Sequence, residues 1–470
     1  MMHLKLKDFN VFDRNNELNL IRTPDGDLSL FRLFFPIFIE MLLSHFMNTA
    51  NVYIMGRVSD DAVASIGVAT QILTLVQFIY VVIGIGVTVV INQNLGAGNT
   101  KRAVNAVSTA IYLSFGLAVV VGIAVSVFAT PLIRLMQLEE KLIPDAAVFL
   151  RITAGISVFS SILTVAMAVS RAYGNTLFPV IVSLLMNVLN AIGSYVVVLR
   201  PFEMPFDSIS GMAFARVASQ LIACIIMMML LKRVRPDIRI LNKEGLDGSL
   251  MKDVLNIGIP SGVQSFSYSI SQTISTAILA VLGAAAISSK IYVTNIVFYS
   301  YILGYSFGQA NGLMVGRLVG QKEFDRAYRM TMRNLTVTLV LNAVFSIIIY
   351  MFRYQLMGTF TSDKAIIDLG VSVMAIDILV EIGRGMNHTF QSTLISTGDS
   401  KFPTIVMICT TWGLSVLFSY LLGVCAGMGL MGCWISFALD EVVRGCLQLM
   451  RWRSGKWRSK SIVKEEAPQN

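Results

Sequence analysis

The sequence predicts an all-α polytopic membrane protein built from two similar bundles of six transmembrane helices. Of its 470 residues, 55% are hydrophobic and 14% are charged, whereas about a quarter of the residues in a soluble domain are charged. An offset of 224 residues also places the first half of the chain on the second without a gap, so that Pro36 falls on Pro260 and Pro179 on Pro403. We therefore expect an internal duplication within a membrane protein.

The apolar residues occur in runs of about 20, the length that an α-helix needs to cross a bilayer. A membrane barrel would instead show segments of about 10 residues with alternating polarity, and Leu113–Val127 is apolar in nearly every register. We therefore predict twelve transmembrane helices, six in each half. Their approximate ranges are 30–55, 63–92, 104–129, 147–169, 178–199, 209–231, 253–281, 287–315, 334–352, 366–393, 403–424 and 430–450.

Polar segments divide the chain into lobes and tails. Residues 1–29 are polar and lack the apolar core of a secretory signal, so we predict an N-terminal tail there and a first lobe over 30–231. The segment 232–252 is charged and rich in turn-forming residues, which suits a linker between lobes. The second lobe is predicted over 253–450, and a basic C-terminal tail over 451–470.

The positive charge of the chain is concentrated on one side of the predicted spans. The C-terminal tail and the loops on its side carry most of the lysines and arginines, whereas the opposite loops hold scattered cations such as Arg134 and Lys364. This positive-inside bias predicts that both termini are cytoplasmic. Each half then enters the membrane in the same direction, so we expect a parallel repeat whose two bundles face a central cavity.

The charge distribution and the motifs also exclude several classes of function. The net charge of +9 is explained by topology and by contact with lipid headgroups, so we expect no nucleic-acid partner. The sequence contains no His-Glu-x-x-His, Gly-x-Ser-x-Gly or phosphate-binding loop, which argues against an enzyme. The five cysteines lie in or beside predicted spans without ligand spacing, so we expect no metal site and no cofactor.

Several short segments match sequence motifs of a known family. They are Phe35–Glu40 (FPIFIE), Met55–Arg57 (MGR), Asp60–Gly67 (DDAVASIG), Asn94–Asn99 (NLGAGN) and Arg171–Thr176 (RAYGNT). In their order and spacing they resemble the multidrug and toxic compound extrusion (MATE) family of cation-coupled efflux antiporters, over about residues 28–450. The resemblance implies two six-helix lobes that form a V, and export of organic, often cationic, compounds driven by protons or sodium.

The chain departs from this family at the residues that bind the coupling ion. Many members have an aspartate at the position of Asn51, and often another at Ser194, whereas Asn190 matches the family's asparagine in span 5. Asn51 and Asn190 therefore occupy ion-coupling positions. However, the side chains of Asn51, Asn190 and Ser194 are all neutral and have no proton to exchange. Tyr268 stands where a second family pattern has an acidic residue. The loss of both aspartates favours protons over sodium as the coupling ion.

Glu40 is the first candidate for ion coupling. It lies four residues after Pro36, within the first half of span 1. An ionised carboxylate in hydrocarbon is costly, so this side chain must face the bundle interior, meet a partner or carry a proton. The equivalent residue in the second half is Gln264, which cannot titrate and is a candidate for substrate binding or gating together with Tyr268. Pro36 and Pro260 each remove a backbone donor and are candidate hinges.

Span 10 holds the densest polar set, and Glu381 is the second candidate for coupling. Its neighbours Asp377, Arg384 and Asn387 are candidates for substrate binding or gating. Residues three or four apart share a helix face, so a buried Glu381 and Arg384 would pair. This pair is either a structural salt bridge or a switch in which Glu381 exchanges Arg384 for a proton or substrate. Asp440 and Arg444 in span 12 also have pairing spacing, for which we expect a structural role.

Together these observations predict a cation-coupled antiporter, with protons more favoured than sodium, that exports organic cations by rocking of the two bundles. The alternative is a flippase of the same superfamily for a lipid-linked or anionic substrate, in which arginines such as Arg384 would meet phosphate. A membrane scaffold without transport is a further alternative. We expect the protein to act as a monomer in the inner or plasma membrane, with the bilayer and a small organic substrate as its partners.

Overall fold

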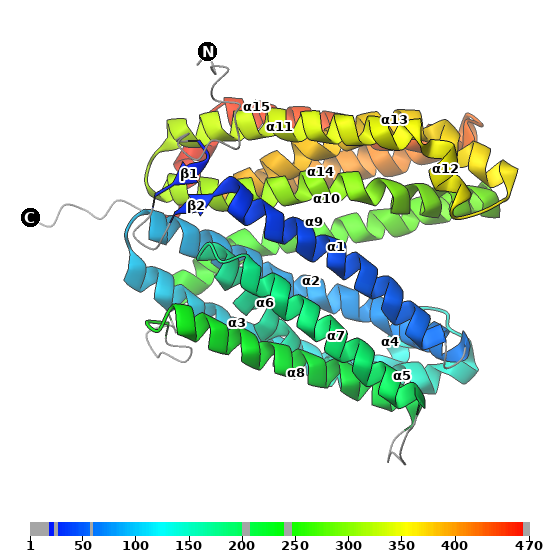
Figure 1. Ribbon diagram of the computed structural model, residues 1–470, viewed down its shortest axis with the longest axis horizontal. Helices are drawn as coiled ribbons and strands as arrows, with labels where there is room; N and C mark the ends of the chain where they lie inside the picture. The colour runs from blue at the N-terminus through cyan, green and yellow to red at the C-terminus, as the bar shows by residue number, and fades with distance from the viewer. Residues whose placement is uncertain (1–17, 23–26, 57–59, 200–206, 239–246, 464–470) are drawn as a thin grey trace, which may run out of the picture. The chain divides into compact units, whose positions relative to one another are not determined.

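The computed structural model describes residues 18–22, 27–56, 60–199, 207–238 and 247–463. For residues 48–56 and 60 it describes the backbone alone. In these ranges the chain is almost entirely helical (Figure 1). The sheet within these ranges is a short antiparallel pair, β1 (Leu20–Ile21) with β2 (Leu28–Ser29), directly before the first long helix.

The first half of the chain contains eight α-helices in the described residues. The helix α1 passes through Pro36 without ending there, and α5 and α6 form a bent pair with an angle of 51° between them. The helices are α1 (Leu30–Gly56), α2 (Asp60–Gly96), α3 (Thr100–Val127), α4 (Ala129–Leu135), α5 (Ile143–Gly155), α6 (Val158–Ala172), α7 (Leu177–Leu199) and α8 (Ser208–Val234).

The second half repeats this order with two local differences. The bent pair is replaced by one continuous helix, α13, and the equivalent of α7 continues from an α-helix into two π-helical segments, η4 and η5. The elements are α9 (Gly248–Val281), α10 (Ala284–Gly320), α11 (Phe324–Met351), α12 (Arg353–Gly358), α13 (Lys364–Ser396), α14 (Lys401–Thr410), η4 (Thr411–Val416), η5 (Ser419–Cys425), α15 (Gly429–Arg453) and the 3₁₀ segment η6 (Lys456–Lys460).

The bounds of the helices confirm the duplication. Residues 60–96 of α2 and 100–127 of α3 recur, at the same offset of 224, as residues 284–320 of α10 and 324–351 of α11. Each of the twelve apolar runs coincides with a helix, with the pair α5–α6, or with α14 and its π-helical continuation. The predicted fold class, an all-α polytopic membrane protein with a parallel repeat of six helices, is therefore correct.

The helices differ in how apolar they are. Among the described residues, seven helices are long and apolar enough to cross a membrane, or eight if α5 and α6 count as one span. The long helices α9, α10, α13 and α15 fall outside this set. All four belong to the second half and carry ionisable residues within predicted spans, so their polar groups must be satisfied inside the protein.

The contacts of the chain define two compact units. The first, called the N-unit here, contains residues 39–92 and 99–262, and the second, the C-unit, contains 93–98, 263–470 and the residues up to Phe38. The chain passes between units at Phe38 in α1 and at Gly262 in α9. These positions are equivalent at the offset of 224, and each lies two residues after the candidate hinge proline. The lobe bounds predicted from chain order remain predictions.

The described ends of the chain pack into the C-unit. Leu18 and Ile21 belong to the same buried cluster as Trp452 and Trp457, whose rings stack with 4.1 Å between their centroids. Arg326 of α11 donates from Nη2 to the backbone oxygen of Leu20 at 2.7 Å. The first and last described segments of the chain therefore belong to the core that supports α10, α11 and α13.

Close packing of α10 against α13 leads to a prediction about stability. A Cβ atom on Gly308 would lie 2.5 Å from the backbone oxygen of His388, so Gly308→Ala should separate the two helices and cost about 1–3 kcal/mol. Gly116→Ala on α3 is the control, because a Cβ there meets no atom within 4 Å. Thermal unfolding in detergent should show a lower midpoint for Gly308→Ala alone. Equal midpoints would contradict the close approach.

Candidate functional site

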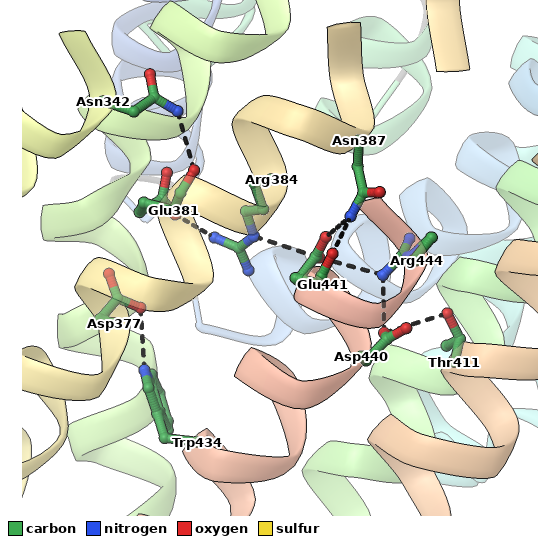
Figure 2. Close-up of polar contacts among 10 residues, drawn as sticks. All are labelled: Asn342, Asp377, Glu381, Arg384, Asn387, Thr411, Trp434, Asp440, Glu441 and Arg444. Carbon is green, nitrogen blue, oxygen red and sulfur yellow. Dashed lines mark hydrogen bonds and ion pairs between the residues drawn. The ribbon is translucent and has the colours of Figure 1, made fainter. Parts of the chain in front are cut away.

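The candidate site lies in the C-unit, where α13 packs against α15. Both helices carry ionisable side chains on the faces that meet (Figure 2). The carboxylates of Asp377, Glu381, Asp440 and Glu441 are all buried, and Glu381 is 0% exposed. Such burial in a membrane protein is tolerated only where the charges are paired or protonated, and it marks a functional position by default.

The α13 side of the site contains the pair expected from sequence. Arg384 donates from Nη1 to Oε1 of Glu381 at 2.6 Å, which confirms that these residues pair. Asp377, one turn earlier, accepts a hydrogen bond from Nε1 of Trp434 at 3.0 Å. From α11, the side chain of Asn342 donates to the backbone oxygen of Glu381 at 3.0 Å. Two other helices, α11 and α15, therefore fix this part of α13.

The α15 side contains the second expected pair. Nη2 of Arg444 lies 2.7 Å from Oδ2 of Asp440 and 3.3 Å from Oε1 of Glu441. The hydroxyl of Thr411, the first residue of η4, donates to the same Oδ2 of Asp440 at 3.4 Å. The predicted pairing of Asp440 with Arg444 is therefore confirmed, and Glu441 shares the same arginine.

Glu441 joins the two sides. Its Oε1 lies 3.6 Å from Nε of Arg384, and its Oε2 accepts from Nδ2 of Asn387 at 2.5 Å. The result is a row of alternating charges, called the charge chain here. Figure 2 shows its order, which is Glu381, Arg384, Glu441, Arg444 and Asp440. The middle acid contacts two guanidinium groups, whereas each terminal acid contacts one.

The charge chain has more acids than bases. Three carboxylates share two guanidinium groups, and Asp377 adds a fourth carboxylate nearby. Taking charges out of water costs several kcal/mol for each ion unless opposite charges compensate them. The fully ionised cluster would carry an excess of negative charge, so it requires a proton or a bound cation. It can therefore exchange one cation for another.

The free atoms of the cluster indicate where such an exchange can occur. Within the described ranges, Oε2 of Glu381 and Oδ1 of Asp440 are buried and lack a hydrogen-bond partner. Both atoms belong to terminal acids of the charge chain, and in each case the other oxygen contacts an arginine. The two ends of the chain thus keep one carboxylate oxygen available, while both oxygens of Glu441 are engaged.

A cavity of about 140 Å³ adjoins the cluster. Its walls come from α9, α10, α13, η4 and α15, and include Tyr268, Lys290, Arg384, Asp440 and Glu441. Pockets for drug-sized ligands measure roughly 300–1,000 Å³, so this cavity suits water and a small cation. Among the described residues, no group of three or more His, Cys, Asp or Glu side chains is arranged to hold a metal ion.

The predicted ion-coupling candidates of the first half belong to the N-unit. Glu40 accepts from Nη2 of Arg171 at 2.6 Å, and the two side chains are 13% and 28% exposed. Glu40 therefore meets a charged partner, which is one of the outcomes expected for an intramembrane acid. Asn190 is half-buried on α7 and Ser194 is buried. The side chain of Asn51 lies outside the described residues.

The remaining predicted residues lie in the cluster, at the cavity wall and within α1 and α9. Asn387 holds Glu441, and Tyr268 lies on the wall of the cavity. Gln264 is buried on α9, and its Oε1 lacks a partner within the described part of the chain. Pro36 and Pro260 lie inside α1 and α9. The functional roles assigned to these residues remain predictions.

Sequence reasoning did not connect the two halves of the cluster. It treated Asp440 and Arg444 as a separate structural pair and gave Glu441 no role, although Glu441 is the residue that links α13 to α15. Lys290 gave a signal, because it is a lone charge in an apolar run. Trp434 gave none, since a tryptophan within an apolar span is ordinary.

The duplicated helices and the buried ionisable cluster define a multi-pass membrane transporter. The MatE family model matches residues 36–196 and 260–421, two segments whose first residues are again separated by the offset of 224. The chain therefore belongs to the MatE family, the extrusion family that its motifs resemble. Its members are transporters and not enzymes.

Individual relatives agree with this assignment. The chain is 34% identical to the "Uncharacterized transporter YisQ" of Bacillus subtilis over 94% of this chain and 98% of that protein. It is 26% identical to the "Probable multidrug resistance protein NorM" of Thermotoga maritima over 96% and 97% of the two chains. Its fold is similar to a solved outward-facing "multidrug resistance MATE family transporter of the MOP superfamily", with a TM-score of 0.83, 17% identity, and coverage of 96% and 98%.

The contacts of Glu441 predict how the cluster responds to substitution. Glu441→Gln removes the acid that both arginines share and should destabilise the protein by about 1.5–3 kcal/mol, the value of a hydrogen bond to a charged group. Asp440→Asn weakens the contact with one arginine alone, so its effect should be smaller. Thermal unfolding of both variants tests this order. The reverse order would show that Glu441 does not hold the cluster together.

Proposed function

We propose that this chain is a cation-coupled antiporter that exports organic cations by alternating access. The observation that carries the proposal is the excess of carboxylates over guanidinium groups in the buried cluster. A site with excess negative charge favours cations over anions, and membership of the MatE family makes transport the established context. The names of relatives such as the Thermotoga protein, "probable multidrug resistance protein", support organic compounds as the exported substrate.

The coupling step is proposed to occur at Glu381. When Glu381 is ionised it pairs with Arg384, and when it carries a proton the arginine is free to satisfy Glu441 more fully. The contacts of Arg384 support this switch, because its guanidinium already reaches both acids, at 2.6 Å and 3.6 Å. The Glu40–Arg171 pair is the second candidate, since it has the same chemistry in the N-unit.

Protons are favoured over sodium as the coupling ion. A sodium ion needs several oxygen ligands around it, and both ends of the charge chain have an arginine in contact with the carboxylate. A proton needs only one free carboxylate oxygen, which Glu381 and Asp440 each retain. We expect no other cofactor.

The movement that opens the site is proposed to involve α1 and α9. Each helix leaves one compact unit and enters the other two residues after its proline. A proline within a helix removes a backbone hydrogen bond and favours bending. This coincidence supports Pro36 and Pro260 as hinges between units that rock against each other, with the protein acting as a monomer.

The flippase alternative receives less support from the cluster. A phosphate group requires guanidinium donors that are available to it. Arg384 and Arg444 both contact carboxylates, and Arg444 is buried. A phosphate-bearing substrate would therefore have to displace these acids against the excess negative charge.

The proposed coupling is tested by flux in liposomes. In proteoliposomes that contain the purified protein, an imposed pH gradient should drive ethidium transport and an imposed sodium gradient should not. Glu381→Gln should lower pH-driven transport roughly tenfold or more, because its amide cannot exchange a proton. The control is Asp368→Asn, an exposed position on the same helix.

Two outcomes would contradict the proposal in different ways. Transport driven by sodium alone would replace the proton as the coupling ion. Normal pH-driven transport by Glu381→Gln together with loss in Glu40→Gln would move the coupling site to the N-unit. Movement of a fluorescent lipid between leaflets, without ethidium flux, would favour the flippase.

The proposed orientation makes a separate prediction. With both termini in the cytoplasm of a cell whose inner or plasma membrane holds the protein, a fluorescent protein fused after Asn470 should fluoresce, and alkaline phosphatase fused there should be inactive. A phosphatase fused within the loop between α11 and α13, on the opposite side, should be active. The inverse pattern would contradict the positive-inside assignment.

A further inference from the structure

Asp440 occupies the end of the charge chain opposite to Glu381, and its environment resembles that of Glu381 closely. Each terminal acid contacts one arginine through one oxygen, at 2.6 Å for Glu381 and 2.7 Å for Asp440. Each keeps its second oxygen without a partner among the described residues. A purely structural ion pair in a low-dielectric site would be expected to satisfy both carboxylate oxygens.

The two ends differ in their access to the cavity. Asp440 lies on the cavity wall and its residue is 3% exposed. Glu381 is 0% exposed and is not among the wall residues of that cavity, although its neighbours Val380 and Arg384 are. Asp440 therefore borders the cavity, although its Oδ1 is itself buried, whereas Glu381 does not border it.

Charged and titratable groups face Asp440 from four helices. Arg444 and Glu441 lie on its own helix, Asp377 and Arg384 on α13, Tyr268 on α9 and Lys290 on α10, all at the cavity or in contact with it. Lys290 is engaged with Thr276, to which it donates at 3.0 Å. Arg444 is therefore the cation in direct contact with Asp440 in the described structure, and it is shared with Glu441.

The shared arginines link the two ends. If Glu381 is neutral, Arg384 can turn fully to Glu441, and Arg444 is then available to Asp440. If Asp440 is neutral, Arg444 can turn fully to Glu441, and Arg384 is then available to Glu381. The excess negative charge of the charge chain can thus lie on Glu381 or on Asp440, and both arginines stay paired in either case. An unpaired arginine would be costly in this buried site.

The helix that contacts Asp440 through Thr411 changes from α-helical to π-helical geometry at this residue. Thr411, which donates to Asp440, begins the π-helical segment η4, and Ser415 of the same segment lies on the cavity wall. The equivalent residues of the first half belong to the regular helix α7. Single π-helical turns within α-helices are frequent at functional sites. Here the π-helical segment places the hydroxyl group of Thr411 at Asp440 and places Ser415 at the cavity wall.

We propose that Asp440 is a second proton-exchanging carboxylate of the transporter, which opens to the cavity at the far end of the charge chain from Glu381. The inference rests on the proposed function. When a substrate cation binds, Asp440 gives the proton on Oδ1 to water and becomes ionised while Arg444 stays on Oδ2. One positive charge thus leaves the acid for each positive charge gained, and the proton returns after the cation leaves.

The experiment counts protons released when ethidium binds to the purified protein in weakly buffered detergent solution, by means of a pH indicator. Ethidium binding is measured in parallel by fluorescence, so that the count refers to bound dye. The wild-type protein should release protons. Asp440→Asn should lower the count by roughly half or more, Glu381→Gln should also lower it, and the double variant should release none.

Two further variants separate loss of exchange from loss of folding. Asp440→Glu restores a carboxylate and should restore release, and Asp368→Asn should release as the wild type does. All variants are compared by thermal unfolding, in which Asp440→Asn should remain folded because Arg444 still contacts Glu441. Failure of Asp440→Glu to restore release would overturn the proposal.

The outcomes distinguish this inference from the proposed function. If Glu381→Gln lowers the count and Asp440→Asn releases as many protons as the wild type, Asp440 is a structural residue and the antiport proposal stands. If the wild-type protein binds ethidium and releases no proton, both proposals fail. Reduced release by both single variants supports exchange at both ends of the chain.

Discussion

The attraction of two arginines for one buried glutamate determines much of what this protein can do. Glu441 lies between Arg384 and Arg444, and it is also held by Asn387. Because α13 and α15 carry these residues at their contact, the charges that are costly individually stabilise one another across the helix interface. The same contact leaves each terminal acid with half of its hydrogen-bonding capacity unused. A fully satisfied network would be inert, whereas this one retains the capacity to exchange a cation.

The duplication shows how a common backbone supports two different interiors. At the offset of 224, Glu381 corresponds to Ser157 and Arg384 to Ser160. Ser157 shares a hydrogen bond of 2.6 Å with the hydroxyl of Tyr80, and Ser160 donates to Gln77 at 3.2 Å. The N-unit therefore contains a neutral hydrogen-bonded network where the C-unit contains an ionic one. Equivalent helices can thus carry neutral hydrogen bonds in one unit and ion pairs in the other.

The polarity of the second-half helices follows from the same arrangement. Within the described residues, α9, α10, α13 and α15 are less apolar than the helices that qualify as membrane spans, and these four helices contribute to the wall of the cavity. A membrane helix can carry such residues because they face the protein interior and not the lipid. The polar residues of these four helices are therefore explained by their position at the cavity and the ionic cluster. The more apolar helices of the first half, which contain the neutral network, do not need this shielding.

The sequence by itself determined the class of protein, the positions of the apolar runs and the duplication, because apolar run length and a repeat at one fixed offset are properties of the chain alone. It also determined the pairs Glu381–Arg384 and Asp440–Arg444, since helical periodicity places residues three or four apart on one face. Only the tertiary structure decided that Glu441 joins these pairs, that Trp434 holds Asp377, and that Glu40 meets Arg171. Those contacts link residues separated by more than fifty positions in the sequence, and no local spacing specifies which face of one helix meets another. Side-chain chemistry identified the ionisable residues, but the packing of helices joined those on α13 and α15 into a single ionic cluster.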